Sequence, residues 1–243
     1  MIASIEVVCD SVADTLAAQA AGAGRIELGS APTLGGLTPS QGLVDAVLEV
    51  ATVPVVVLVR PQPGGFVVDG ATVSAMVSDI RWLSARGVAG VVVGALDTDG
   101  EVDIDACRRF RDAAEDIEFV FHRAFDRVAD RDGALDAALE LGVDRILTSG
   151  GAASALAGAG EIARLRERAA GAMEFLPAGG IRAANVGRVT VATGCRWVHA
   201  GPRCGVDSTV PGGEDSDFPG ATRLDVDALA AMVDASTNTG RVD

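Results

Sequence analysis

The feature that most constrains this chain is a regular alternation of short β-branched apolar runs with alanine-rich segments of helical length. Runs that are apolar on both faces are typical of parallel strands covered by helices. We predict eight strands, at Ile5–Cys9, Arg25–Leu28, Val55–Val59, Gly90–Val93, Glu118–Phe121, Arg145–Leu147, Glu174–Pro177 and Trp197–His199. The predicted helices lie near Val12–Ala21, Gln41–Val50, Thr72–Ala85, Ile104–Ala114, Gly133–Leu141, Ala153–Ala169, Ala184–Ala192 and Asp225–Ala235. Eight such units predict a closed (β/α)8 TIM barrel, with residues 1–243 as a single domain.

A recurring glycine supports this architecture. Glycine stands three residues before every second predicted strand, as Gly22, Gly87, Gly142 and Gly194. We expect each of them to end a helix in the left-handed conformation before the chain turns into a strand. Recurrence at every second strand fits a barrel built from βαβα quarters. One segment interrupts the pattern: residues 204–222 are rich in Gly, Pro, Asp and Ser, and we predict a long loop there before the last helix.

Composition excludes several kinds of function. The chain contains no lysine, which excludes Schiff-base catalysis and a Walker A phosphate loop. Its formal net charge of -14 argues against a nucleic acid or an anionic membrane as partner. No apolar run is long enough to span a bilayer, and the first residues lack the basic start of a signal peptide. We therefore expect a cytoplasmic protein.

Candidate site residues fall at the ends of predicted strands, where (β/α)8 barrels carry their ligand sites. The two histidines, His122 and His199, end the fifth and eighth strands, and imidazole exchanges protons near neutral pH. Glu6, Glu27 and Arg60 are charged residues in otherwise apolar strands. Because an unpaired buried carboxylate is costly, we predict that Arg60 pairs with Glu6 or Glu27. Two interpretations stay open: a catalytic site with His122 as acid or base, and a structural network of ion pairs.

Glycine-rich segments after the last strands are candidates for binding an anion. Ser149 and Gly150 follow the sixth strand, Gly179 and Gly180 follow the seventh, and Gly201 follows the eighth. Glycine lets backbone N–H groups approach a ligand, and the loops after strands seven and eight are the usual phosphate site of this fold. The position of these glycines therefore predicts an anion-binding edge beside the histidines.

A metal site would need a different set of residues. Cys195 begins the strand that His199 ends, so these two lie too far apart to share an ion. Cys9, His199 and Cys204 could approach one another where the first and eighth strands meet, and soft thiolates would select Cu(I) or zinc. The alternative is that these cysteines are buried structural residues.

The same segments resemble the CutC family of copper-homeostasis proteins. The resemblance rests on Glu6–Ser11, Gly22–Leu28, Gly35–Ser40, Arg60–Pro61, Phe121–Asp126, Leu147–Gly150 and Ala178–Ile181. It implies a (β/α)8 barrel that self-associates in the cytoplasm and takes part in copper handling. It also implies that Glu6, Glu27, Arg60 and His122 share one cleft.

The chain departs from the family at two positions. Family members often carry cysteine where this chain has Val8 and Gly29, and its own thiol is shifted to Cys9. Side chains alternate along a strand, so Cys9 should face away from the barrel interior if Glu6 faces into it. Three functions are left open: copper homeostasis with copper ion binding, catalysis on a small anionic carboxylate or phosphate, and a catalytically idle barrel with a structural polar interior.

Overall fold

The computed structural model describes residues 3–205 and 222–237. Eight strands form one parallel sheet in the order β7-β6-β5-β4-β3-β2-β1-β8. They are β1 (Ser4–Cys9), β2 (Arg25–Leu28), β3 (Val55–Leu58), β4 (Gly90–Val93), β5 (Glu118–Phe121), β6 (Arg145–Thr148), β7 (Glu174–Pro177) and β8 (Trp197–Ala200). A parallel bridge between Ala178 and His199 joins the two ends, so the sheet nearly closes into the predicted barrel.

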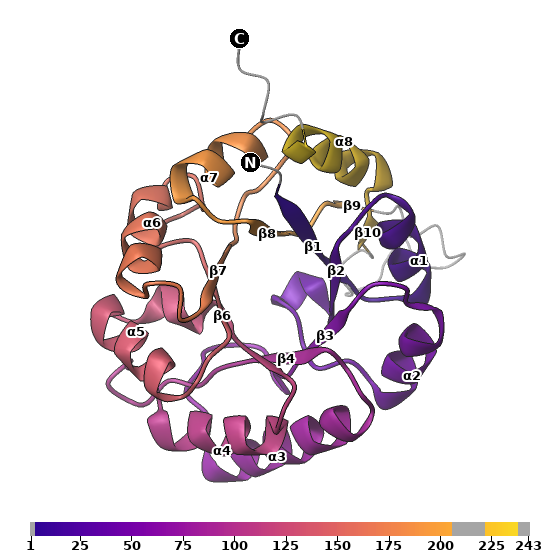
Figure 1. Ribbon diagram of the computed structural model, residues 1–243. Helices are drawn as coiled ribbons and strands as arrows, with labels where there is room; N and C mark the ends of the chain where they lie inside the picture. The colour runs from indigo at the N-terminus through magenta and orange to yellow at the C-terminus, as the bar shows by residue number, and fades with distance from the viewer. Residues whose placement is uncertain (1–2, 206–221, 238–243) are drawn as a thin grey trace, which may run out of the picture.

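A ring of helices surrounds the sheet (Figure 1). They are α1 (Val12–Ala20), α2 (Gln41–Val50), α3 (Gly70–Ala85), α4 (Ile104–Ala114), α5 (Arg131–Glu140), α6 (Ala159–Arg168), α7 (Val186–Thr193) and α8 (Val226–Thr237). Side-chain oxygens of Ser11, Ser40, Asp69, Asp103 and Asp130 accept from backbone N–H groups at the starts of the first five helices. Such caps satisfy N–H groups that have no partner within the helix, and they give several of the chain's many aspartates a structural role.

Alternation along the strands divides the core into two layers. Outward residues such as Val7, Cys9 and Ile26 pack in the large cluster between sheet and helices. Inward residues such as Val56, Val92 and Leu176 form a second cluster inside the barrel. Because side chains point alternately to the two faces, Glu6 and Val8 face the interior while Cys9 faces the helices, as predicted.

The recurring glycines adopt the expected backbone conformation. Gly22, Gly87, Gly142 and Gly194 have φ values of 90°, 75°, 64° and 68°. This left-handed region is costly for residues with a Cβ atom, which explains why glycine is placed there. The helix-to-strand turns before β2, β4, β6 and β8 therefore share one device.

The structure also contains elements that the sequence did not indicate. The strands β9 (Arg203–Gly205) and β10 (Thr222–Leu224) pair antiparallel, and the rest of the predicted 204–222 loop lies outside the described residues. Two 3-10 helices, η1 (Pro32–Leu34) and η2 (Arg123–Arg127), follow β2 and β5. The sixth helix begins at Ala159 and not at Ala153, because the segment before it folds as turns.

Candidate functional site

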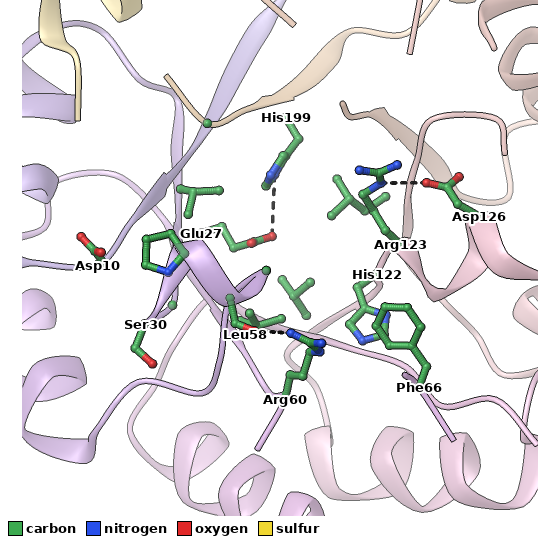
Figure 2. Close-up of a pocket in the computed structure, with 18 of the residues that line it drawn as sticks. Asp10, Glu27, Ser30, Leu58, Arg60, Phe66, His122, Arg123, Asp126 and His199 are labelled. Carbon is green, nitrogen blue, oxygen red and sulfur yellow. Dashed lines mark hydrogen bonds and ion pairs between the residues drawn. The ribbon is translucent and has the colours of Figure 1, made fainter. Parts of the chain in front are cut away.

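A cavity of about 690 Å³ opens at the C-terminal ends of the strands. Inward residues of the strands form its inner wall: Val8, Glu27, Leu58, Val92, Leu147 and His199. Loop residues form its rim, and Figure 2 shows His199 and Glu27 facing each other on one side, with Arg60, Phe66 and His122 grouped on another. The volume and position are those of a small-molecule site in this fold.

Three titratable side chains, Glu6, Glu27 and His199, form a cluster at one wall of the cavity: Glu27 and His199 line the wall, and Glu6 lies behind it. The Nδ1 atom of His199 lies 2.7 Å from Oε1 of Glu6 and 3.7 Å from Oε2 of Glu27. Glu6 is completely buried, and only 6% of the surface of Glu27 is exposed. The cluster forms because β1 lies between β2 and β8, with Glu6 beside His199 in the register of the sheet.

Burial and charge shift the pKa values of this cluster in different directions. Burial raises the pKa of Glu27 to about 7, and the neighbouring His199 opposes that shift only in part. Burial would also raise the pKa of Glu6, but hydrogen bonds and positive charge from His199 and Arg25 leave it lowered. Burial would lower the pKa of His199, but Glu27 and Glu6 outweigh it and leave that pKa raised. Such a cluster can exchange a proton or hold a cation.

The predicted pairing of Arg60 with a buried glutamate is wrong. Arg25 holds Glu6, with its Nε atom 2.5 Å from Oε2 of that carboxylate. Arg60 instead donates to the backbone oxygens of Leu34, Gly36 and Gly64. The guanidinium of Arg60 therefore fixes two loops at the rim of the cavity and has no carboxylate partner among the described residues.

Below the cavity, Arg25 belongs to a network of ion pairs that fills the other end of the barrel. Arg25 also contacts Glu118 at 2.8 Å, Arg145 contacts Glu118 at 2.5 Å, and Arg145 contacts Glu174 at 3.0 Å. The guanidinium groups of Arg25 and Arg145 lie over the Trp197 ring, at 5.5 Å and 5.0 Å from its centre. The charges at this end of the barrel are therefore paired with one another, and apart from Glu6 none of these residues was among the predicted candidates.

His122 is a neutral group at the cavity wall. It is buried, and its ring lies 4.7 Å from the ring of Phe66. Burial lowers its pKa to about 4. Its Nδ1 atom accepts from the backbone N–H of Ala124 at 3.3 Å, so the proton of the neutral ring is on Nε2. At neutral pH the ring is therefore a hydrogen-bond donor through Nε2.

The backbone N–H groups of the loop after β6 already have hydrogen-bond acceptors within the protein. The Asp126 carboxylate accepts from the backbone N–H groups of Ser149 and Gly151, and Thr148 Oγ1 accepts from the N–H of Gly150. Arg123 completes this group by pairing with Asp126 at 2.7 Å. The N–H groups of Ser149 and Gly150 thus already have acceptors within the protein.

The other predicted anion-binding glycines lie in different places. Gly201 lines the cavity, whereas Gly179 and Gly180 are not among its lining residues. An added Cβ atom at Gly179 would lie 3.6 Å from the Arg123 guanidinium and from the Ser149 side chain. Gly179 therefore sits behind the Arg123–Asp126 group.

The cysteines of the described structure do not reach the cavity. Cys9 is fully buried between the sheet and the helices, and burial raises the pKa of its thiol to about 12. The other two buried thiols, Cys107 and Cys195, lie outside the cavity lining, and the side chain of Cys204 lies outside the described part of the chain. Tight Cu(I) binding needs converging soft ligands. The described donors around His199 are carboxylates, which do not fit that ion.

Fold and cavity together define a (β/α)8 barrel protein with a polar small-molecule pocket at the C-terminal mouth. The sequence model of the CutC family matches residues 3–203. This chain belongs to the CutC family. Within the described residues, no helix combines the length and apolar character needed to cross a bilayer.

Relatives and solved structures agree with this assignment. A CutC family protein of Xanthomonas campestris (strain B100) is 44% identical over 199 residues, which cover 82% of this chain and 83% of the relative. The human protein named copper homeostasis protein cutC homolog is 39% identical over 204 residues, covering 84% and 75%. The crystal structure of a Streptococcus agalactiae protein described as a copper homeostasis protein CutC superposes with a TM-score of 0.77 at 28% identity, covering 82% and 98%. A phosphoribosylanthranilate isomerase from Thermotoga maritima, with a TM-score of 0.60 at 14% identity and coverage of 97% and 99%, shares the fold alone.

Proposed function

We propose that this protein is an enzyme that binds a small anionic molecule in the barrel mouth and acts on it there. The observation that carries the proposal is the uncompensated charge of Arg60. Its hydrogen bonds go to three neutral carbonyl oxygens, and its buried Nε atom has no hydrogen-bond partner among the described residues. In a chain with a net charge of -14, a guanidinium without a counter-charge at a cavity rim favours an anionic ligand.

The charges around the rest of the cavity support the same ligand class. Four arginines line it, Arg60, Arg123, Arg127 and Arg203, against three carboxylates, Asp10, Glu27 and Asp126. Arg123 pairs with Asp126 and Arg203 with Asp10, so those charges offset each other. Arg60 and Arg127 then remain against Glu27, so the lining keeps an excess of positive charge that these two arginines carry.

His122 would contribute a hydrogen-bond donor to the reaction in this site. A neutral imidazole whose Nε2–H donates can stabilise negative charge that develops on a carbonyl or phosphate oxygen. We therefore assign His122 as a neutral hydrogen-bond donor to the reacting group, and Arg60 as the partner of the ligand's charge. The reactions that this pair favours are those in which a substrate oxygen gains negative charge, such as proton abstraction next to a carbonyl.

Copper ion binding is the competing function, which the family resemblance implies. The described donor atoms do not support it, since no described thiol lines the cavity. Cytoplasmic location and self-association, also implied by the resemblance, belong to the same set of proposals. Cell fractionation tests the first, and sedimentation of the purified protein tests the second.

The experiment for the anion site is isothermal titration with inorganic phosphate and with malonate, using neutral glycerol as a reference. Wild-type protein should bind at least one of the two anions saturably, and Arg60→Gln should lose that binding. Arg81→Gln is the matched control, because Arg81 is exposed on α3 and is not among the cavity residues. Equal anion binding by wild type and Arg60→Gln would contradict the proposal.

A further inference from the structure

We propose that Glu6, Glu27 and His199 form a site for one divalent metal ion. Each side chain offers one ligand atom, and these three atoms lie within 4.8 Å of one another. The ligands come from β1, β2 and β8, three neighbouring strands of the barrel. A site on adjacent strands is held by the hydrogen bonds of the sheet and is therefore preorganised. The inference goes beyond the proposed anion site and does not depend on it.

An unpartnered oxygen points to the ligand. Oε2 of Glu27 is buried and accepts no hydrogen bond from any described residue, while Nδ1 of His199 lies 3.7 Å away. Such a buried carboxylate oxygen loses its hydration and gains no hydrogen bond in return, which is costly. A cation between Glu6, Glu27 and His199 would satisfy this oxygen directly.

Arg25 prepares Glu6 for this role. It holds Oε2 of Glu6 at 2.5 Å, and Oε1 is turned towards Nδ1 of His199 at 2.7 Å. Groups behind a metal ligand commonly fix its orientation in this way. On binding, the ion would take the place of the proton between Glu6 and His199, and that proton would leave to solvent.

The chemistry of the donors selects the class of ion. Two carboxylate oxygens and one imidazole nitrogen suit ions such as Mn²⁺ and Zn²⁺, whereas Cu(I) favours thiolates. Glu27 and His199 line the 690 Å³ cavity, so the remaining coordination positions would face its interior. Three protein ligands with open positions are typical of catalytic metal sites and not of structural ones.

The test is a titration with Mn²⁺, in buffer free of phosphate and carboxylates, followed by loss of the electron paramagnetic resonance signal of the free ion. Wild-type protein should bind one Mn²⁺ per chain, and Zn²⁺ should displace it. Glu27→Gln should weaken binding by about tenfold or more, since it replaces an anionic ligand with an amide. The control is Asp10→Asn, which removes a carboxylate from the same cavity but outside the cluster, and it should bind as wild type does.

Absence of binding up to about 1 mM Mn²⁺, or equal binding by wild type and Glu27→Gln, would overturn the proposal. Circular dichroism of each variant checks that it is folded. A second measurement, nuclear magnetic resonance of the wild-type protein, needs no substitution. Mn²⁺ should broaden the backbone amide resonances of Glu6, Glu27 and His199 at lower concentrations than those of the exposed helices. Broadening elsewhere would equally overturn it. Because phosphate is absent, failure here leaves the result for Arg60 and phosphate unaffected.

Discussion

Substitution of Arg25 by Met is expected to destabilise the protein strongly. Arg25 is 2% exposed and its partner Glu6 is completely buried, so the substitution leaves Glu6 with His199 as its remaining partner and also removes a partner of Glu118. Removing one partner of a buried ion pair costs about 3–5 kcal/mol. For a domain of this size, this corresponds to a fall in Tm of about 6–20 °C.

Arg86 on the surface provides a matched control. Arg86 pairs with Asp45 at 2.5 Å and lies over the ring of Trp82 at 5.3 Å, much as Arg25 pairs with Glu6 and lies over Trp197. The side chains of Arg86 and Asp45 are 46% and 39% exposed, so Arg86→Met should cost no more than about 1 kcal/mol. Arg25 also contacts Glu118, so the comparison measures the effect of burial together with that second ion pair.

Urea unfolding followed by circular dichroism measures both free energies of unfolding. Adding Glu6→Gln to Arg25→Met should recover a large part of the lost stability, because the buried carboxylate that lost its arginine partner is then replaced by a neutral amide. Equal losses for Arg25→Met and Arg86→Met would refute the reasoning from burial. No recovery in the double variant would show that lost packing or the lost contact with Glu118, and not the charge of Glu6, causes the loss.

Three further predictions concern the cavity, the strands and copper. In the folded protein His122 has a pKa of about 4, below its usual 6.5, so on acidification the unfolded chain takes up this proton first. The free energy of unfolding should therefore fall by up to about 3 kcal/mol as the pH drops from 6.5 to 4. His122→Asn should flatten this pH dependence in urea unfolding, and an unchanged dependence would contradict the burial of a neutral His122. Gly90→Ala should destabilise the barrel more than Gly142→Ala. A Cβ atom at position 90 would lie 2.6 Å from the backbone oxygen of Glu118, whereas a Cβ atom at position 142 would meet open space and only the strain of a φ of 64°. Equal losses of stability in thermal melts would argue against the close approach at Gly90. Cu(I) should not transfer stoichiometrically from a chelator to the protein, and Cys9→Ser should make no difference; a one-to-one complex that disappears with Cys9→Ser would restore copper binding.

Much of the barrel could be predicted because its signals are local. The strand β2 and the helix α2 have the bounds expected from their patterns, and the positive φ of Gly194 follows from its place between a helix and a strand. The predicted start of α6 was wrong because it depends on a contact with a distant part of the chain. The backbone N–H of Ala155 donates to the backbone oxygen of Gly179 at 2.9 Å, so this alanine-rich stretch is held in turns by the loop after β7.

The candidate site was predicted only in part, because its partnerships join distant segments. Glu6, Glu27 and His199 were recognisable as polar residues in apolar strands, and the order of the strands brings them together. The partner of Glu6 was missed: Arg25 was placed at the start of its predicted strand but was not considered as a partner for a buried carboxylate. Its contact with Glu118, 93 positions along the chain, depends on how the barrel closes. One signal was present in the sequence: Arg25, Glu118, Arg145 and Glu174 are charged residues that each stand at the first position of a predicted strand.

The proposed function requires that the barrel mouth holds a small anion between Arg60 and His122. The most direct measurement is a crystal structure of the protein grown with phosphate at a concentration that saturates binding in solution. We expect an anion within hydrogen-bond distance of the Arg60 guanidinium and of Nε2 of His122. A phosphate bound elsewhere, with only solvent between Arg60 and His122, would contradict it.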